Sequence, residues 1–170
     1  MATQIRGKVW RFGANISTDD IISGIHLSRL DASDLTKFAF QNLRPEFARQ
    51  VRRNDIIVAE KHFGIGSSRE EAPAVLQALG IGVIVAASFA RIFYRNAFNI
   101  GLPAIEFPAI ADSPDLIEDG DIVTVNLSKG TLENHRTKQT YPVTKIPDFL
   151  MQYIKAGGAL PLLKQKLTTS

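Results

Sequence analysis

Residues 55–86 read DIIVAEKHFGIGSSREEAPAVLQALGIGVIVA. Two apolar runs, 55–59 and 81–86, are rich in β-branched residues, which is typical of strands buried on both faces of a parallel sheet. The segment 68–79 has apolar residues at helical spacing, and Gly80 is suited to end that helix. The apolar face of the predicted helix carries Ala72, Val75, Leu76 and Leu79. This order of strand, glycine-rich loop, helix and strand predicts an α/β unit.

The neighbouring segments extend this unit in both directions. Residues 5–12 alternate apolar and polar side chains, and residues 104–107 form a short apolar run, so both predict strands. The stretch 21–29 is irregular and is expected to be a loop; a long loop in a compact domain is usually functional or mobile. Helices are expected at 31–42, 45–52 and 90–99.

The last third of the chain has an antiparallel character. Asp119-Gly120 and Lys129-Gly130 predict turns, and alternating residues predict strands at 122–127 and, more weakly, at 140–144. This pattern favours a small antiparallel sheet beside the α/β unit.

A final helix is expected at 149–156, where Gly157-Gly158 ends it, and the polar tail after Leu163 is expected to fray. Neither half of the chain has enough apolar residues for an independent core. Residues 1–170 are therefore expected to form one domain of the α/β class.

The charge balance does not favour nucleic-acid binding. The net charge is +3 with a sequence pI of about 9.3, and the basic residues are scattered. The densest group is Arg49, Arg52 and Arg53, which lies beside Glu46 and Asp55. Such a group is typical of a solvated surface of mixed charge, since no aromatic residues alternate with the cations.

The chain has no cysteine, which excludes disulfides, a cysteine nucleophile and an iron–sulfur cluster held by its own thiolates. No apolar run reaches the ~18 residues of a membrane span, and the N-terminus MATQIRGKVWRFG lacks the apolar region of a secretory signal. We therefore expect a cytoplasmic protein.

The segment FGIGSSREEAP, residues 63–73, has the features of an anion site. Its two glycines let the backbone approach a ligand, and a helix N-terminus attracts anions. Ser67 or Ser68 is expected to cap the helix, with a glutamate three residues later in a capping box. Arg69 is unfavourable beside the positive end of a helix, unless it binds a carboxylate or phosphate as a fork. The segment matches neither the Walker nor the dinucleotide-binding pattern, so nucleotide binding is not supported.

Other polar groups are less specific. Ser17-Thr18-Asp19-Asp20 is either an ordinary turn or a pair of acids that orients an arginine or holds a metal. Arg91 and Arg95 share one helical face and either flank an anion or pair with acids such as Glu70, Glu71 or Asp19. The three histidines, His26, His62 and His135, have no metal-ligand spacing.

Three segments occur in an informative order: STDD at 17–20, FGIGSSREEAP at 63–73 and ASFARIFYRNAFNIGLP at 87–103. With these, the chain from Gly7 to Leu163 resembles the small subunits of the 3-isopropylmalate dehydratase and homoaconitase group, two-subunit relatives of aconitase. The resemblance implies the swivelling β/β/α domain of the aconitase type, with a mixed sheet and helices in a separate layer. It also implies a large-subunit partner that carries a [4Fe–4S] cluster, an active site between the subunits, and dehydration and rehydration of a hydroxy-dicarboxylate or tricarboxylate.

The resemblance also implies roles for four residues. Ser67 would be the general base, acting as an alkoxide near the helix N-terminus. Arg69 would hold a substrate carboxylate, Ser68 would donate hydrogen bonds in the same turn, and Asp19 would orient neighbouring polar groups at the edge of the pocket.

In the family that this chain resembles, the loop after Asp20 contacts the variable group of the substrate. It contains His26-Leu27-Ser28-Arg29 here, which matches neither the Tyr-Leu-Arg-Thr of homoaconitate enzymes nor the apolar pattern of isopropylmalate enzymes. Leu27 and Ser28 suit a compact, weakly polar group, whereas Arg29 would suit an additional carboxylate. Isopropylmalate is the first expectation; homoaconitate, dimethylmalate and citramalate remain alternatives, and a non-catalytic anion-binding module is a more distant one.

Overall fold

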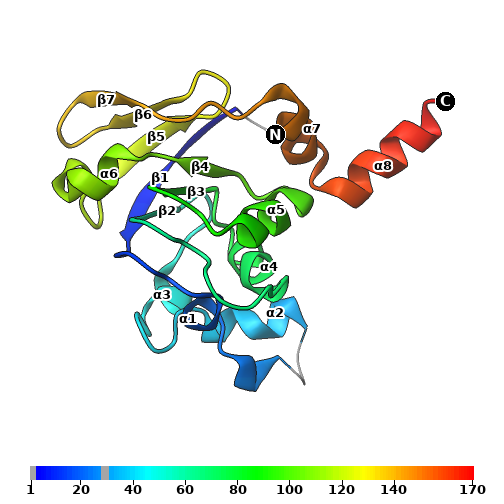
Figure 1. The fold of residues 1–170 in the computed structure, drawn as a ribbon, viewed down its shortest axis with the longest axis horizontal. Helices are drawn as coiled ribbons and strands as arrows, with labels where there is room; N and C mark the ends of the chain where they lie inside the picture. Colours follow the sequence, from blue (N-terminus) through cyan, green and yellow to red (C-terminus); the bar gives the residue numbers. More distant parts are fainter. Residues whose placement is uncertain (1–2, 28–30) are drawn as a thin grey trace.

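The computed structural model describes residues 3–27 and 31–170. Its centre is a seven-stranded sheet in the order β4-β3-β2-β1-β5-β6-β7 (Figure 1). The strands are β1 Gln4–Arg11, β2 Ile56–Ala59, β3 Val83–Ala86, β4 Ala104–Glu106, β5 Ile122–Asn126, β6 Thr131–Asn134 and β7 Gln139–Pro142.

Strand β1 joins a parallel half and an antiparallel half of the sheet. Its residues Val9–Arg11 pair in parallel with β2, and its residues Gln4–Lys8 pair antiparallel with β5. Strands β2, β3 and β4 are parallel to one another, whereas β5, β6 and β7 form antiparallel pairs. Every residue of β2 and β3 is buried, which explains their unbroken apolar runs. The expected mixed sheet is confirmed.

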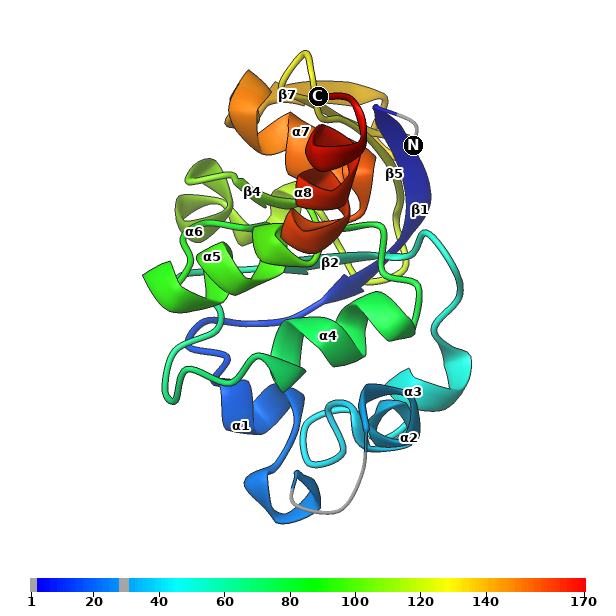
Figure 2. The same ribbon diagram turned by 90° about the vertical axis from the view of Figure 1, so that its right-hand side faces the viewer.

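The helices are short, apart from four. They are α1 Thr18–Ile21, α2 Ala32–Leu35, α3 Phe47–Gln50, α4 Glu71–Ala78, α5 Arg91–Asn99, α6 Ala109–Asp112, α7 Asp148–Ala156 and α8 Ala159–Thr168, with 3-10 turns η1 Gly24–His26, η2 Thr36–Phe38 and η3 Pro114–Leu116. Helices α4 and α5 connect successive parallel strands that step in one direction across the sheet, so right-handed connections place both on the same face. The two helices pack against each other there (Figure 2).

Three expectations about the elements were wrong, and one strand was missed. The helix expected at 68–79 begins at Glu71. The segment expected to be a helix at 31–42 is the four-residue α2 followed by the 3-10 turn η2. Strand β6 was not predicted. The tail expected to fray after Leu163 is helical to Thr168, and Figure 1 shows this helix, α8, extending away from the sheet.

The buried apolar side chains form one continuous cluster that includes residues of both halves of the sheet. Trp10, Phe12, Phe40 and Phe47 pack edge-to-face or stacked within it. A continuous core of this kind is the property expected of a domain that folds as one unit. Within the described residues, no helix is both long and apolar enough to cross a lipid bilayer.

Candidate functional site

The candidate site lies where three parallel strands end. The segments that leave the carboxyl ends of β1, β2 and β3 meet there, which is the usual place for a ligand in an open α/β sheet. Ser17 forms an isolated parallel bridge with Ile65, and Phe63 forms one with Phe89. The backbone N–H of Gly64 donates to the carbonyl of Ile16 at 2.7 Å. Backbone hydrogen bonds therefore hold the three segments side by side.

Helix α1 is fixed by its own first residues. The Ser17 hydroxyl accepts from the backbone N–H of Asp20, and the Asp20 carboxylate accepts from the N–H of Ser17, which is a complete capping box. The STDD segment is therefore the capped start of a one-turn helix rather than the ordinary turn that the sequence suggested. Thr18 and Asp19, between Ser17 and Asp20, contact the glycine-rich loop.

Asp19 and Arg69 form an ion pair across the site. Arg69 Nη1 donates to Asp19 Oδ1 at 2.8 Å and to the carbonyl of Ile22 at 3.2 Å. The pKa of the Asp19 carboxyl is lowered, mainly by the hydrogen bond from Arg69 and then by the backbone N–H of Gly24. The Arg69 side chain is 22% exposed and that of Asp19 is 63% exposed. The expectation that Asp19 orients a neighbouring polar group has a clear geometric counterpart.

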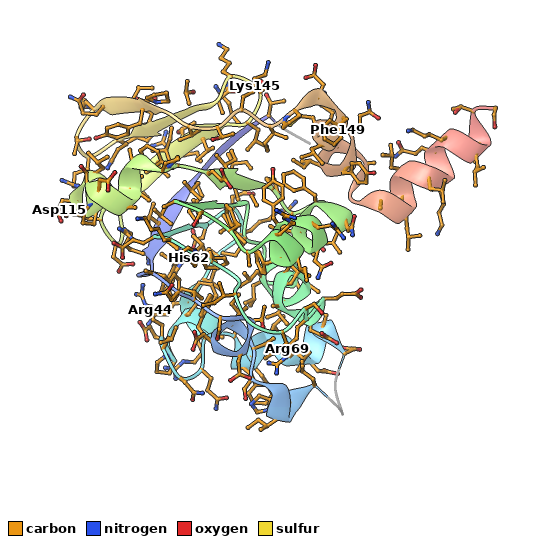
Figure 3. The ribbon with its side chains drawn as sticks, viewed as in Figure 1. Arg44, His62, Arg69, Asp115, Lys145 and Phe149 are labelled. Carbon is orange, nitrogen blue, oxygen red and sulfur yellow. The ribbon has the colours of Figure 1, made fainter. Side chains whose placement is uncertain are left out.

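Only one edge of the Arg69 guanidinium is used in this way. Within the described residues, its hydrogen bonds leave from Nη1 alone. Figure 3 places Arg69 beside the start of α4, next to the elements that follow β1. Among the described residues, its other donors have no acceptor, and such donors suit a planar anion such as a carboxylate.

Ser67 and Ser68 do not cap a helix, contrary to the expectation. Helix α4 begins at Glu71, its N-cap residue is Glu70, and no side chain caps it. Both serines are exposed and lie in the loop before the helix. The explanation of an anion site by the helix N-terminus is therefore wrong for Ser67.

The loop offers a different set of donors. The carbonyl of Ser67 accepts from the Thr18 hydroxyl at 3.0 Å and from the backbone N–H of Arg69 at 2.9 Å. The backbone N–H groups of Gly66, Ser67 and Ser68 donate to no acceptor in the described part of the chain. Three backbone N–H groups that lack an acceptor among the described residues, beside an arginine, offer donors to an anion without a helix dipole.

The remaining candidates do not join this group, or cannot be placed. Leu27 is half-buried against the core, whereas Ser28 and Arg29 lie outside the described residues. Arg91 and Arg95 are exposed on α5, and they pair with none of the acids proposed for them among residues 3–27 and 31–170.

The histidines do not form a metal site. His26 stacks on Phe38 and hydrogen-bonds Gln41. His135 lies on the other half of the sheet, where it hydrogen-bonds Thr124. No group of three or more histidine, aspartate or glutamate side chains that could hold a metal occurs in the described parts of the chain.

The site is an open face of this chain. Two hollows in the described structure have volumes of about 730 and 650 Å³. The larger is lined by residues that precede β2, β3 and β4, at the opposite edge of the parallel sheet, and neither hollow includes Ser67, Arg69 or Asp19. An enclosed pocket around these residues would need a covering surface from elsewhere.

Residues 31–110 match the family described as the aconitase C-terminal domain. The chain is 47% identical over 163 residues to the 3-isopropylmalate dehydratase small subunit of Aliarcobacter butzleri, with 96% of each chain covered. It is 42% identical over 170 residues to the isopropylmalate/citramalate isomerase small subunit of Methanocaldococcus jannaschii, covering 100% of this chain and 99% of the relative.

A crystal structure of 3-isopropylmalate dehydratase from Methanocaldococcus jannaschii superposes with a TM-score of 0.90 at 35% identity, covering 98% of this chain and 96% of that chain. The fold therefore agrees with the expected swivelling domain of the aconitase type. Full-length similarity of sequence and fold together show that this chain belongs to the family of 3-isopropylmalate dehydratase small subunits, within the aconitase superfamily.

Proposed function

We propose that this chain is the small subunit of a two-subunit hydro-lyase that isomerises 3-isopropylmalate, a step of leucine biosynthesis. The full-length similarity to 3-isopropylmalate dehydratase small subunits carries this proposal. The arrangement of Ser67, Arg69 and Asp19 supports it, because it combines a hydroxyl, a cation and free backbone donors on one open face.

Arg69 binds a substrate carboxylate in this proposal. Asp19 and the Ile22 carbonyl fix the guanidinium through Nη1, so the free edge is held in a constant direction. A carboxylate can accept two parallel hydrogen bonds from such an edge, which a lysine cannot provide.

Ser67 takes the proton from the carbon beside that carboxylate. A serine hydroxyl is a weak base, so its ionised form needs stabilisation. The free backbone N–H groups of residues 66–68 and the nearby Arg69 guanidinium supply positive potential at this point. These groups replace the helix terminus that the sequence suggested.

A large subunit completes the site. The relatives are named small subunits, and the candidate residues lie on a face that this chain does not enclose. A [4Fe–4S] cluster does not fit this chain, which has no cysteine, so its ligands would belong to the large subunit. There the cluster would act as the Lewis acid for the hydroxyl group that leaves and returns.

The loop after α1 favours an alkyl substituent on the substrate. Ile25 is 79% exposed, and Leu27 is half-buried beside it. Gly24 lies close to the Arg69 guanidinium, since a Cβ built at Gly24 would be 2.9 Å from Nη2. Two apolar side chains in the loop that follows Gly24 suit isopropylmalate or citramalate, and a relative is named for both.

The test is activity with a partner. The chain is co-expressed with a large subunit of the same family, the cluster is reconstituted without oxygen, and hydration of isopropylmaleate, citraconate, dimethylmaleate and homoaconitate is measured. We expect the highest kcat/KM with isopropylmaleate. Absence of hydration with all four compounds, in a complex that forms and retains its cluster, would refute the proposed function.

Ser67→Ala tests the base directly. We expect turnover to fall by about 10³-fold or more, while the complex still assembles, because the proton acceptor is lost. Ser113→Ala is the matched control, because Ser113 is also exposed but lies outside the site, and it should leave turnover unchanged. A Ser67→Ala enzyme as fast as this control would remove Ser67 from the mechanism.

A further inference from the structure

Thr18 connects the segment after β1 with the glycine-rich loop. It is only 2% exposed, although it lies between the partly exposed Ser17 and the exposed Asp19. Its backbone N–H donates to the carbonyl of Ile65 at 2.8 Å, and its hydroxyl donates to the carbonyl of Ser67 at 3.0 Å. One residue therefore binds the loop at two points, two residues apart.

The second contact fixes a particular peptide group. The Ser67 carbonyl has two lone pairs, and both are used, one by the Thr18 hydroxyl and one by the N–H of Arg69. The peptide bonds of the described residues are trans, so the N–H of Ser68 points away from that carbonyl. Because the carbonyl points inward to the buried Thr18, the N–H of Ser68 points to the open face of the site.

We infer that Thr18 is a positioning residue for the reaction: its hydroxyl holds the Ser67–Ser68 peptide so that the Ser67 side chain and the Ser68 N–H face the substrate. This inference rests on the proposed function, which makes Ser67 the base. It adds to the proposed site a residue that lies 49 positions before Ser67 in the sequence.

The hydroxyl, rather than the volume of the side chain, is the important feature. Valine has nearly the same shape as threonine, and it would fill the same buried space. It would leave the Ser67 carbonyl with only the Arg69 N–H, so the peptide could rotate. Misplacement of a reacting group by about 1 Å is enough to reduce turnover about 100-fold.

The experiment compares Thr18→Val, Thr18→Ser and Thr36→Val in the complete two-subunit enzyme. Thr36 is the matched control, because its hydroxyl also donates to a backbone carbonyl, that of Ser33 at 2.8 Å, away from the site. We expect Thr18→Val to lower kcat about 10- to 100-fold with KM changed less than about threefold. Thr18→Ser should restore most of kcat, and Thr36→Val should resemble the unaltered enzyme.

A second measurement separates positioning from folding. In the isolated chain, Thr18→Val should shift the carbonyl ¹³C resonance of Ser67 and speed hydrogen exchange of the Arg69 N–H, while urea unfolding remains a single cooperative transition. Normal kcat in Thr18→Val would overturn the inference, as would a loss that Thr18→Ser does not restore. If the unaltered enzyme itself hydrates none of the substrates, the proposed function fails instead, which is a distinguishable result.

Discussion

Replacing Gly64 with alanine tests how tightly the glycine-rich loop is packed. Gly64 has a φ angle of +85°, and a Cβ at this position would lie 2.3 Å from Cγ of Phe93. Phe93 is buried and packs edge-to-face on Phe63, so its ring has little room to move. The alanine methyl would therefore meet both a backbone and a packing penalty.

The two penalties can be estimated separately. A non-glycine residue in the left-handed region costs about 1–2 kcal/mol, and extra atoms forced into a packed site cost about 1–3 kcal/mol. Gly64→Ala should therefore lower the free energy of unfolding by about 2–5 kcal/mol. For a domain of this size, that corresponds to a decrease in Tm of about 4–20 °C.

Gly120→Ala is the matched control. Gly120 also has a φ angle of +85°, but nothing lies within 4 Å of its Cβ position. Its substitution carries only the backbone penalty, about 1–2 kcal/mol. Urea unfolding at constant temperature gives both free energies. Equal losses in the two variants would show that Phe93 does not restrict the loop, and the packing argument would be wrong.

Two further predictions concern buried carboxylates elsewhere in the sheet. Asp55 accepts a hydrogen bond from the indole N–H of Trp10 at 2.9 Å in the core. Asp55→Ala should therefore lower the free energy of unfolding by about 2–4 kcal/mol, and Asp55→Asn should lower it less, because the amide oxygen still accepts this bond. Equal losses of the two variants in urea unfolding would contradict this explanation. Burial tends to raise the pKa of Asp121, but the hydrogen bond from Arg136 and others outweigh burial and lower it. The stability that Asp121 contributes is therefore present above its unfolded pKa of about 3.9 and is lost as the pH falls through the lower folded pKa. The free energy of unfolding in urea, measured between pH 2 and 6 at intervals on the order of half a pH unit, should depend less on pH in Asp121→Asn than in the unaltered chain. An unchanged pH dependence in this variant would refute the assignment.

The strands β2 and β3 could be predicted because of their environment. A strand covered on both faces needs apolar residues at every position, and such a run is visible in the sequence. Strand β6 was missed for the opposite reason. Its inward residue Asn134 is completely buried but polar, and it is satisfied by donating to Asp121 at 2.8 Å. A buried polar residue interrupts the alternation of apolar and polar residues, so the sequence of β6 lacks the pattern that indicates a strand.

The start of α4 was misplaced although the sequence contained the signal. A helix capped at Ser67 would place Pro73 in its interior, where proline lacks the N–H needed for the helical hydrogen bond. In the structure α4 begins at Glu71, so Pro73 lies in the first turn, where that N–H has no helical partner in any case. The serine-glutamate spacing suggested a capping box, but the proline determines the boundary.

The roles of Thr18 and of the Ile22 carbonyl could not be read from the sequence, because both depend on contacts between distant segments. The pairing of Ser17 with Ile65 sets the register of the two segments, and the contacts of Thr18 and Asp19 follow from that register. A pattern within one segment carries no information about such a register. The tetrapeptide STDD by itself thus indicated acids near the loop but not which of them faces Arg69, and only the family resemblance singled out Asp19.

The glycine-rich loop is held in place by backbone hydrogen bonds to the segment that follows β1. The caps of helices α1 and α4 do not hold the loop. The loop is held by backbone hydrogen bonds of 2.7 to 2.8 Å, from Gly64 to Ile16 and from Thr18 to Ile65. The Asp19–Arg69 pair and the Ser67 peptide are therefore linked to the ends of the parallel strands through this backbone pairing. Under the proposed function, association with a large subunit would benefit from this arrangement, because the groups proposed to bind and deprotonate the substrate would need less reordering. In the proposed two-subunit enzyme, this chain would therefore fix the directions of Arg69 and of the Ser67 peptide, and the large subunit would enclose them.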